Sequence, residues 1–376
     1  MTLSSEARPP ATPAGVPYGP EDVTFPGQEA GAVARRRTPG VRAVRLGPWS
    51  LRLAPRSAAV GAVLLLVAAA VSVAALSTGE FTVPVRDVVT ALFGQGSPAA
   101  ELIVGRLRAP RVVTGLLVGA AFGLSGAIFQ SLTRNPLGSP DFIGITAGGS
   151  TGGVLAVIAG GSAPQIAGGS LLGSVVCAAL IYVLAYRRGV QGYRLILVGI
   201  GANALLLAAD NYLLTRANIN DAATAGAWLS GSLSGRGWEH AVPVACALAV
   251  LLPLCAFLSR PLRRLEMGED VARQVGIRVE AVRAVAVTVG VLLCGVATAA
   301  AGPVMFVAMA APQLARRLAS SPGVTLVTSA LTGAVLLTGA DLAAQRLLAP
   351  AQLPVGVLTA AIGGVYLALL LRKERR

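Results

Sequence analysis

Few residues of this chain could carry acid–base, nucleophilic or phosphate chemistry. Its only lysine is Lys373 and its only histidine is His240. A P-loop ATPase needs a GxxxxGK[ST] motif whose lysine reaches the phosphates of the nucleotide, and Lys373 stands outside any such motif. A single histidine also excludes an HExxH metal site. The sequence therefore predicts no catalytic residue, no metal site and no ATPase site. If ATP drives this protein, a separate chain must bind it.

The cysteines and the few polar residues inside apolar runs predict packing contacts rather than reactions. The cysteines form no CxxC pair and are predicted to be small buried side chains: Cys177, Cys246, Cys255 and Cys294. A proton-coupled carrier normally places carboxylates or histidines in mid-membrane. Asp210 and Asp341 instead fall near the ends of apolar runs, and Asn203 lies within one. We predict helix–helix hydrogen bonds or a wet vestibule for them, which argues against an ATP-independent secondary carrier without excluding it.

The composition indicates that lipid surrounds most of the chain. Of 376 residues, 54% are hydrophobic and 13% are charged, and the mean hydropathy is +0.70. A soluble domain carries about 25% charged residues. The net charge of +14 comes almost entirely from arginines between the apolar runs, a pattern typical of membrane topology and not of nucleic-acid binding. The 45 glycines predict helices whose backbones approach closely.

Uncharged apolar runs of about 20 residues predict an all-α polytopic membrane protein with about ten transmembrane helices. Residues 1–56, rich in proline, glycine and alanine, are predicted to form a disordered cytoplasmic arm and not a cleaved signal. The membrane domain is predicted over 57–372, followed by a cytoplasmic tail over 373–376. The predicted spans are 57–77, 112–133, two within 142–186, 195–215, 241–259, two within 284–319, 324–340 and 354–371. The arginine bias between them predicts that both termini are cytoplasmic.

A charged connector over about 261–280 is the most informative loop. Its apolar residues are spaced for a pair of short amphipathic helices, and glycines separate and end the pieces. These residues are Leu265, Val271, Val275 and Ile277, with Gly268 and Gly276. A compact charged element at the membrane surface suits the docking of a soluble partner. A solvated connector is the alternative that the pattern leaves open.

Several long segments, in order along the chain, resemble one family of transporters. They are RLRAPRVVTGLLVGAAFGLSGAIFQSLTRNPLGSPDFIGITAG at 106–148, WLSGSLSG at 228–235, MGEDVARQVGI at 267–277, AGPVMFVAMAAPQLARRL at 301–318 and LPVGVLTAAIGG at 353–364. Over residues 57–372 the sequence resembles the FecCD-type permeases of type II ABC importers, which include vitamin B12, haem and ferric-siderophore permeases. The RNPLGSPD segment is most similar to the ferric-enterobactin type.

This resemblance implies a multi-pass permease of the cell membrane with a vitamin-B12-permease-like bundle, which imports ferric siderophores by alternating access. The partners it implies are a second permease subunit (a paralogue or an identical copy), two ATPase subunits that use ATP and magnesium, an extracytoplasmic siderophore-binding protein and the ferric siderophore itself. The chain is expected to bind no cofactor and no nucleic acid. Haem or cobalamin is the alternative cargo within the family, because the binding protein mainly selects the cargo.

The resemblance also implies roles for individual residues. The connector residues expected to contact the ATPase are Gly268, Glu269, Asp270 and Arg273. The arginines expected to dock the binding protein are Arg108, Arg111 and Arg346, and Asn203 is expected to line the translocation path. The sequence departs from the family at two positions. Gln313 stands where a histidine is frequent, and Gln345 stands where an arginine is frequent.

Overall fold

The computed structural model describes residues 42–46, 49–53, 55–79, 81–186, 192–321, 323–348 and 352–374, and most of them are helical. The helices are α1 (Pro55–Ser77), α2 (Val85–Leu92), α3 (Pro98–Ala100), the π-helix η1 (Glu101–Arg108), α4 (Ala109–Thr133), α5 (Ile145–Ile158), α6 (Ala163–Ala185), α7 (Gly192–Arg216), α8 (Ile219–Leu229), α9 (Trp238–Leu265), α10 (Glu269–Gln274), α11 (Val279–Ala301), α12 (Val307–Ala319), α13 (Leu326–Leu347) and α14 (Val355–Glu374).

The predicted all-α, membrane-spanning architecture is confirmed. In the described chain, seven helical segments are long and apolar enough to cross a membrane, judged by length and composition. They are Pro55–Ser77, Pro98–Thr133, Ala163–Ala185, Tyr193–Arg216, Trp238–Leu265, Val279–Ala301 and Leu326–Leu347. Two shorter apolar helices are α5 and the Val355–Tyr366 part of α14. Together with α12, which has 13 residues, these make ten segments, and the protein is an all-α polytopic membrane protein.

The segment before α1 differs from the disordered arm that the sequence predicts. Strands β1 (Arg42–Leu46) and β2 (Trp49–Leu53) pair antiparallel, with Arg42 opposite Leu53 and Leu46 opposite Trp49. Apolar and polar residues largely alternate in RAVRL and WSLRL, which is the period of a strand. This short signal lies beside a long proline- and glycine-rich stretch that has no period. Residues 1–41 of the predicted arm, and Arg375 and Arg376 of the tail, lie outside the described residues.

The bundle is built around α4, which packs against α9, α11, α12 and α13. Glycines bring α4 and α13 together: a Cβ at Gly119 would overlap the backbone of Gly333, and a Cβ at Gly333 would overlap Gly119. One turn further along α4, a Cβ at Gly123 would overlap the backbone of Ser329. Lipid gives helices no hydrophobic drive to associate, so small residues that permit close packing hold them together. The packing role predicted for the glycines is confirmed at this interface.

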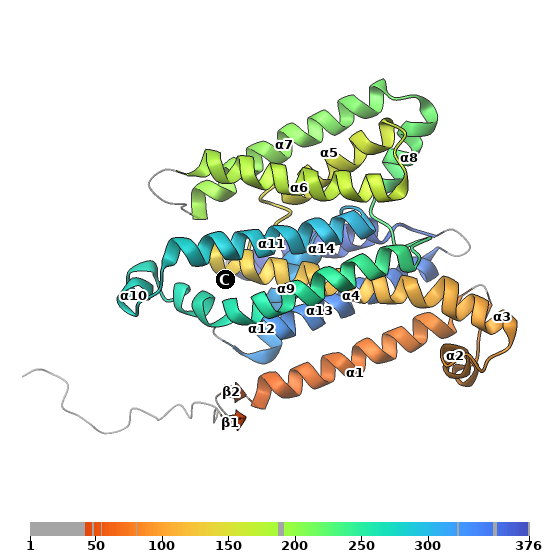
Figure 1. The fold of residues 1–376 in the computed structure, drawn as a ribbon, viewed down its shortest axis with the longest axis horizontal. Helices are drawn as coiled ribbons and strands as arrows, with labels where there is room; N and C mark the ends of the chain where they lie inside the picture. The colour runs from red at the N-terminus through yellow and green to blue at the C-terminus, as the bar shows by residue number, and fades with distance from the viewer. Residues whose placement is uncertain are drawn as a thin grey trace, which may run out of the picture.

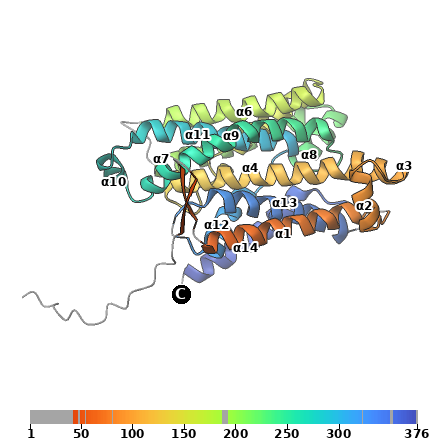
Figure 2. The same ribbon diagram turned by 60° about the horizontal axis from the view of Figure 1, so that its bottom comes forward.

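The remaining helices cover two sides of this centre. Figure 1 shows α5, α6, α7 and α8 along one side, and α1 along the opposite side with α2 at its end. α5 and α6 pack on each other and on α11, whereas α1 packs on α13. In the turned view of Figure 2, α4 runs between α9 and α13.

The two ends of the bundle carry different connectors. α10 lies at one end, together with the start of α1 and the end of α14 (Figure 1). The other end carries α2, α3 and α8 (Figure 1). We call these the α10 end and the α2 end. Each end holds one group of the residues that the sequence singled out.

Candidate functional site

Two helices inside the bundle are short, and each follows an irregular segment. α5 has 14 residues and follows residues 134–144, whereas α12 has 13 residues and follows residues 302–306. At about 1.5 Å per residue, each helix is about 20 Å long, against about 30 Å of hydrocarbon in a bilayer. The residue before each helix has a left-handed backbone, with φ 87° at Gly144 and φ 67° at Phe306. At membrane depth such irregular backbone must find its hydrogen-bond partners within the protein.

Asp141 joins the two irregular segments. Its Oδ2 accepts a hydrogen bond from the backbone N–H of Phe306 at 3.3 Å, and its Oδ1 accepts one from the hydroxyl of Thr146 at 2.8 Å. Next to it, the rings of Phe142 and Phe306 meet edge to face, with centroids 6.5 Å apart. The carboxylate therefore satisfies a backbone donor at the start of α12 that has no partner within the helix. We call Asp141, Phe142, Gly144, Thr146 and Phe306 the α5–α12 junction.

Gln313 holds α12 to the same segment further along the helix. Its Nε2 donates to the carbonyl of Pro136 at 2.8 Å, and its Oε1 accepts from the hydroxyl of Tyr366 on α14 at 3.2 Å. The amide of Gln313 thus donates and accepts at once. The amide links α12, α14 and the segment 134–144.

A second amide fixes α12 to α4. Gln130 donates from Nε2 to the carbonyl of Met309 at 2.9 Å, and its Oε1 accepts from Arg316 at 2.8 Å. Gln130 is buried, so losing either partner would leave a buried polar atom unpaired. α12 is therefore held by side chains on both sides of its axis.

At the α10 end, the predicted connector forms one short helix between α9 and α11. Gly268 precedes α10 with φ 119°. Glu269 accepts hydrogen bonds from Arg283 on α11 and from Arg273 on α10. Asp270 pairs with Arg273 at 3.2 Å, yet its side chain is 92% exposed, against 32% for Glu269. Glu269 thus fixes α10 on α11, while Asp270 points its charge to the surroundings.

Three apolar side chains beside these charges are also exposed. Met267, Val271 and Val275 are 71%, 42% and 54% exposed. Val271 lies on α10, and Met267 and Val275 flank this short helix. Close by, Glu266 accepts a hydrogen bond from the backbone N–H of Val324 at 3.1 Å, which ties the end of α9 to the start of α13. The connector is therefore firmly anchored and presents an apolar and acidic surface.

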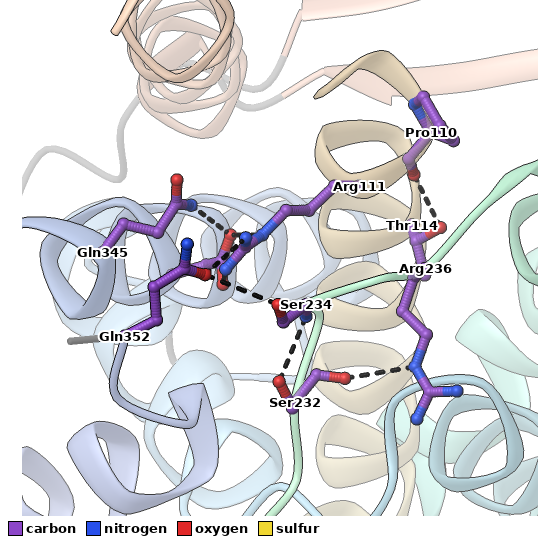
Figure 3. Close-up of polar contacts among 9 residues, drawn as sticks. Pro110, Arg111, Thr114, Ser232, Ser234, Arg236, Gln345 and Gln352 are labelled. Carbon is purple, nitrogen blue, oxygen red and sulfur yellow. Dashed lines mark hydrogen bonds and ion pairs between the residues drawn. The ribbon is translucent and has the colours of Figure 1, made fainter. Parts of the chain in front are cut away.

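At the α2 end, Arg111 on α4 forms a two-point ion pair with Asp341 on α13 (Figure 3). Its Nε and Nη2 donate to the two carboxylate oxygens at 2.9 Å each. Gln345 donates to the same carboxylate at 2.8 Å, and Gln352 accepts from Arg111 at 3.3 Å. The side chains of Arg111 and Asp341 are 15% and 6% exposed. The helix–helix hydrogen bonds predicted for Asp341 are confirmed. The guanidinium group of Arg111 binds a carboxylate of its own chain.

The other arginines at this end differ in their exposure. Arg108 donates to the backbone carbonyls of Leu76 and Phe81, which fastens α1 and the start of the α2 connector to η1. Arg236 donates to the carbonyl of Ser232 at 3.2 Å (Figure 3), and burial lowers the pKa of its guanidinium. Arg346, in the last turn of α13, is exposed. Of the three arginines predicted to dock a binding protein, Arg346 is the one whose charge faces outward.

Asn203 is half-buried on α7, next to the α5–α12 junction. A Cβ added at Gly144 would lie 3.4 Å from the backbone nitrogen of Asn203 and 3.1 Å from the carbonyl oxygen of Gly199. Asp210, further along α7, is buried. The structure thus brings Asn203 close to the junction, while the connector and the arginine cluster lie at opposite ends of the bundle.

The sequence indicated the break before α12 but not the contacts across the junction. The Gly302-Pro303 pair is a turn signal between the two spans predicted within 284–319. Asp141 and Phe306 are 165 residues apart in the chain, so no local pattern relates them. Gln313 was noticed only as a departure from the family, and its two hydrogen bonds depend on the tertiary fold.

A bundle of mostly apolar helices, in which two short helices are preceded by irregular backbone held inside the protein, defines a polytopic membrane transport protein. The folded, charged connector at one end is where such a protein can meet a soluble partner. The chain belongs to the FecCD transport family, which matches residues 64–373.

Individual relatives match nearly the full membrane part. The ferric enterobactin transport system permease protein FepG of Escherichia coli (strain K12) is 44% identical over 316 residues, which cover 83% of this chain and 96% of that protein. The achromobactin transport system permease protein CbrC of Dickeya dadantii (strain 3937) is 36% identical over 318 residues, covering 83% and 90%. A solved structure of a metal-chelate type ABC transporter in an inward-facing conformation is 25% identical with a TM-score of 0.74, covering 84% of this chain and 99% of that one.

Proposed function

We propose that this chain is the membrane-spanning permease subunit of an ABC importer that carries ferric siderophores across the cytoplasmic membrane. The observation that carries this proposal is the 44% identity to a ferric enterobactin permease over 96% of that protein's length. The structure supports it through the short helices α5 and α12, because discontinuous helices line the substrate paths of many transporters.

The α10 end is assigned to the cytoplasm by the positive-inside rule. The arginines of the connectors at this end are Arg56, Arg134, Arg194, Arg260, Arg263, Arg264, Arg273, Arg278, Arg283, Arg316 and Arg317. Those at the α2 end are Arg86, Arg106, Arg108, Arg111, Arg216, Arg236 and Arg346. This bias among the described residues supports cytoplasmic termini and an extracytoplasmic α2 end.

In this proposal, separate ATPase subunits dock on α10. Asp270 offers an exposed carboxylate, and Met267, Val271 and Val275 offer an exposed apolar surface. Glu269 acts through Arg283, because its carboxylate joins α10 to the first turns of α11. A movement of α10 would pass along α11 to residues 302–306 and α12. The contacts of Asp141 and Gln313 would then carry it to the segment 134–144.

The extracytoplasmic binding protein would dock at the α2 end. Arg346 offers an exposed charge there, and an arginine is suited to two-point contacts with a carboxylate. Arg108 and Arg111 support the docking surface from beneath, because their guanidinium groups bind within the chain. Charge reversal at Arg346 should therefore weaken binding more strongly at low salt than at high salt.

A second permease subunit would pack on the α7 side. α7 exposes large apolar side chains on the outer margin of the bundle: Leu197, Ile200, Leu205 and Leu207. Cargo would pass between the two subunits, along a path that includes Asn203 and the α5–α12 junction. Alternating access would open this path to one side of the membrane at a time.

Reconstitution into vesicles tests the proposal as a whole. Vesicles that hold this permease and its partner permease should accumulate radioactive iron from a ferric siderophore only with ATP, the ATPase and the binding protein present. Omission of each component is the control. Uptake driven by a proton gradient without the ATPase would contradict the importer proposal and favour the secondary carrier.

Paired substitutions test the docking of the ATPase on α10. Asp270→Ala removes an exposed charge and should lower ATPase affinity about tenfold, the effect of losing about 1.4 kcal/mol of interface energy. Glu269→Ala should also lower the melting temperature, since Arg283 keeps its ion pair with Glu280 but loses the one that joins α11 to α10. Asp87→Ala, which removes an exposed acid from α2 at the other end, is the matched control. Unchanged co-purification of the ATPase with the Asp270 variant would remove α10 from the interface.

A further inference from the structure

Helix α2 presents three kinds of surface around its axis. One face is buried: Val88 and Ala91 are 2% and 6% exposed and pack with residues of α1 and η1 such as Leu76 and Val104. A second face is apolar but exposed, and it includes Val85 at 52%, Val89 at 48% and Leu92 at 51%. The third face carries the exposed charges of Arg86 and Asp87.

The order of these faces follows from the helical repeat of about 100° per residue. Val85, Val89 and Leu92 are spaced by four and three residues, so they share one face. Val88 and Ala91 lie directly beside that face. Arg86 and Asp87 lie on the far side of the exposed apolar face. Around the axis of α2, the exposed apolar face therefore lies between the face that packs on the protein and the charged face.

Exposed aromatic residues flank α2 in the chain. Phe81 precedes the helix and is 70% exposed, and Phe93 follows it and is 77% exposed. We call Phe81, Val85, Val89, Leu92 and Phe93 the α2 strip. None of these five residues is charged or polar, which is unusual for an exposed surface that meets water or a reversibly bound protein.

α1, which leads into α2, also has an exposed apolar surface. α1 exposes large apolar side chains along its length, including Leu66 at 72% and Val73 at 40%. The chain turns directly from α1 into α2, because the N–H of Val83 bonds to the carbonyl of Ser77 at 2.9 Å. Arg108 fixes this turn on the bundle by binding Leu76 and Phe81. α2 is thus held at the edge of the membrane-spanning surface and does not project away from it.

We propose that α2 is an interfacial helix that inserts the α2 strip into the lipid leaflet at the α2 end of the bundle. The acyl chains near the headgroups contact the strip, and water contacts Arg86 and Asp87. Amphipathic helices of this kind lie in the plane of the interface, and aromatic side chains are enriched at that depth. A docking protein above the bundle would meet the charged face and not the strip.

Spin-label accessibility in lipid nanodiscs tests this placement. The full chain carries the substitution Cys246→Ser, because Cys246 is exposed whereas Cys177, Cys255 and Cys294 are buried. A nitroxide is then attached at Val89→Cys or, as the matched control on the same helix, at Asp87→Cys. The label at position 89 should collide more often with oxygen, which concentrates in lipid, than with a water-soluble nickel chelate. The ratio of the two accessibilities should be several-fold higher at position 89 than at position 87.

Two further variants calibrate the accessibility ratio, and size exclusion identifies variants that misfold. Leu66→Cys on α1 gives the value for a residue in lipid, and Val85→Cys repeats the measurement on the α2 strip. Only variants that elute as the wild-type protein does on size exclusion are compared. Equal ratios at positions 85, 87 and 89 would overturn the proposal. It would also fail if the label at position 89 reported water in the permease alone and became immobile when the binding protein was added. Neither result depends on transport, so the proposed function is tested separately.

Discussion

α5 and α12 begin in the same way, but different atoms hold their first turns. Both follow an irregular segment, and both are preceded by a residue with positive φ, 87° at Gly144 and 67° at Phe306. Glycine adopts this conformation freely, whereas another residue there costs about 1–3 kcal/mol. Gly144 lies against the backbone of α7 near Gly199. Phe306 is held by the carboxylate of Asp141 and by ring contacts with Phe142 and Gly363.

The α5–α7 contact is made by backbone atoms, whereas the contacts that hold Phe306 before α12 are made by side chains. Before α5, the backbone at Ile143 and Gly144 lies directly against the backbone of α7 at Gly199. At the start of α12, a strained residue persists because its ring and its N–H both have partners elsewhere in the fold. α5 should therefore tolerate no added atoms at its contact with α7, whereas α12 should depend on a few replaceable side chains. Substitutions at the two contacts test whether α5 and α12 differ in this way.

The largest effect is expected from a methyl group added on the α5 side. A Cβ at Gly199 would lie 2.6 Å from the carbonyl oxygen of Ile143, and 2.7 Å from its Cα. Gly199→Ala should therefore destabilise the protein by about 4 kcal/mol or more, because backbone cannot move aside easily. Gly201→Ala, on the same helix with nothing within 4 Å of the added atom, is the matched control. Thermal unfolding in detergent measures both, and equal melting temperatures would refute the backbone contact.

The corresponding change on the α12 side should be rescuable. A Cβ at Gly363 would overlap the ring of Phe306, whereas one at Gly364 meets nothing within 4 Å. Gly363→Ala alone should destabilise the protein, and Phe306→Ala should relieve part of that loss in the double variant. A double-mutant cycle measures the coupling, which is about 0.5–3 kcal/mol for residues in contact. Strict additivity would show that the ring does not form this contact.

A smaller effect is expected from changes at Phe306 itself. Phe306→Ala should destabilise the protein by about 3 kcal/mol, since it removes a packed ring and leaves a strained backbone. Phe306→Gly loses the same ring but relieves the backbone, so it should be more stable than the alanine variant by about 1 kcal/mol. The melting temperatures of the two variants measure this difference in stability. An alanine variant as stable as the glycine variant would mean that positive φ at this position does not destabilise a residue with a Cβ atom.

The smallest effect is expected at Asp141. Asp141→Ala leaves the N–H of Phe306 without its acceptor and should cost about 1–3 kcal/mol. Asp141→Asn should cost less, because its amide oxygen can accept from Phe306 while its NH2 donates to the hydroxyl of Thr146. The ratio of cargo moved to ATP hydrolysed should fall in the alanine variant and recover in the asparagine variant. If the two variants behaved alike, the carboxylate would not link the segments in the way that its contacts indicate.

Most of the fold could be predicted from the sequence because lipid imposes a simple pattern. Uncharged runs of spanning length and arginines between them predicted the ten segments, and Gly302-Pro303 indicated the break before α12. The hairpin at 42–53 was missed because ten alternating residues give a weak signal. The π-helical turn of η1 at Glu101–Arg108 was also missed, because no local rule distinguishes its residues from those of an α-helix.

The candidate site was less predictable, because its contacts join distant parts of the chain. Gly268, Glu269, Asp270 and Arg273 were expected to act together, but the sequence did not show that Glu269 binds Arg283. Arg111 and Asp341 were both noticed, 230 residues apart, yet they were assigned to separate roles. The packing of α4 on α13 buries both side chains next to each other, and the two charges then pair. The sequence does not show this packing.

The amide of Gln313 has one more consequence, for the chemical environment in which the permease can work. An imidazole at this position would gain or lose a proton near its usual pKa of about 6.5, and its donor and acceptor pattern would change with it. A carboxamide does not titrate in that range. The bond from Gln313 to Pro136 and the bond from Tyr366 to Gln313 should therefore keep the same strength in mildly acidic and mildly alkaline surroundings.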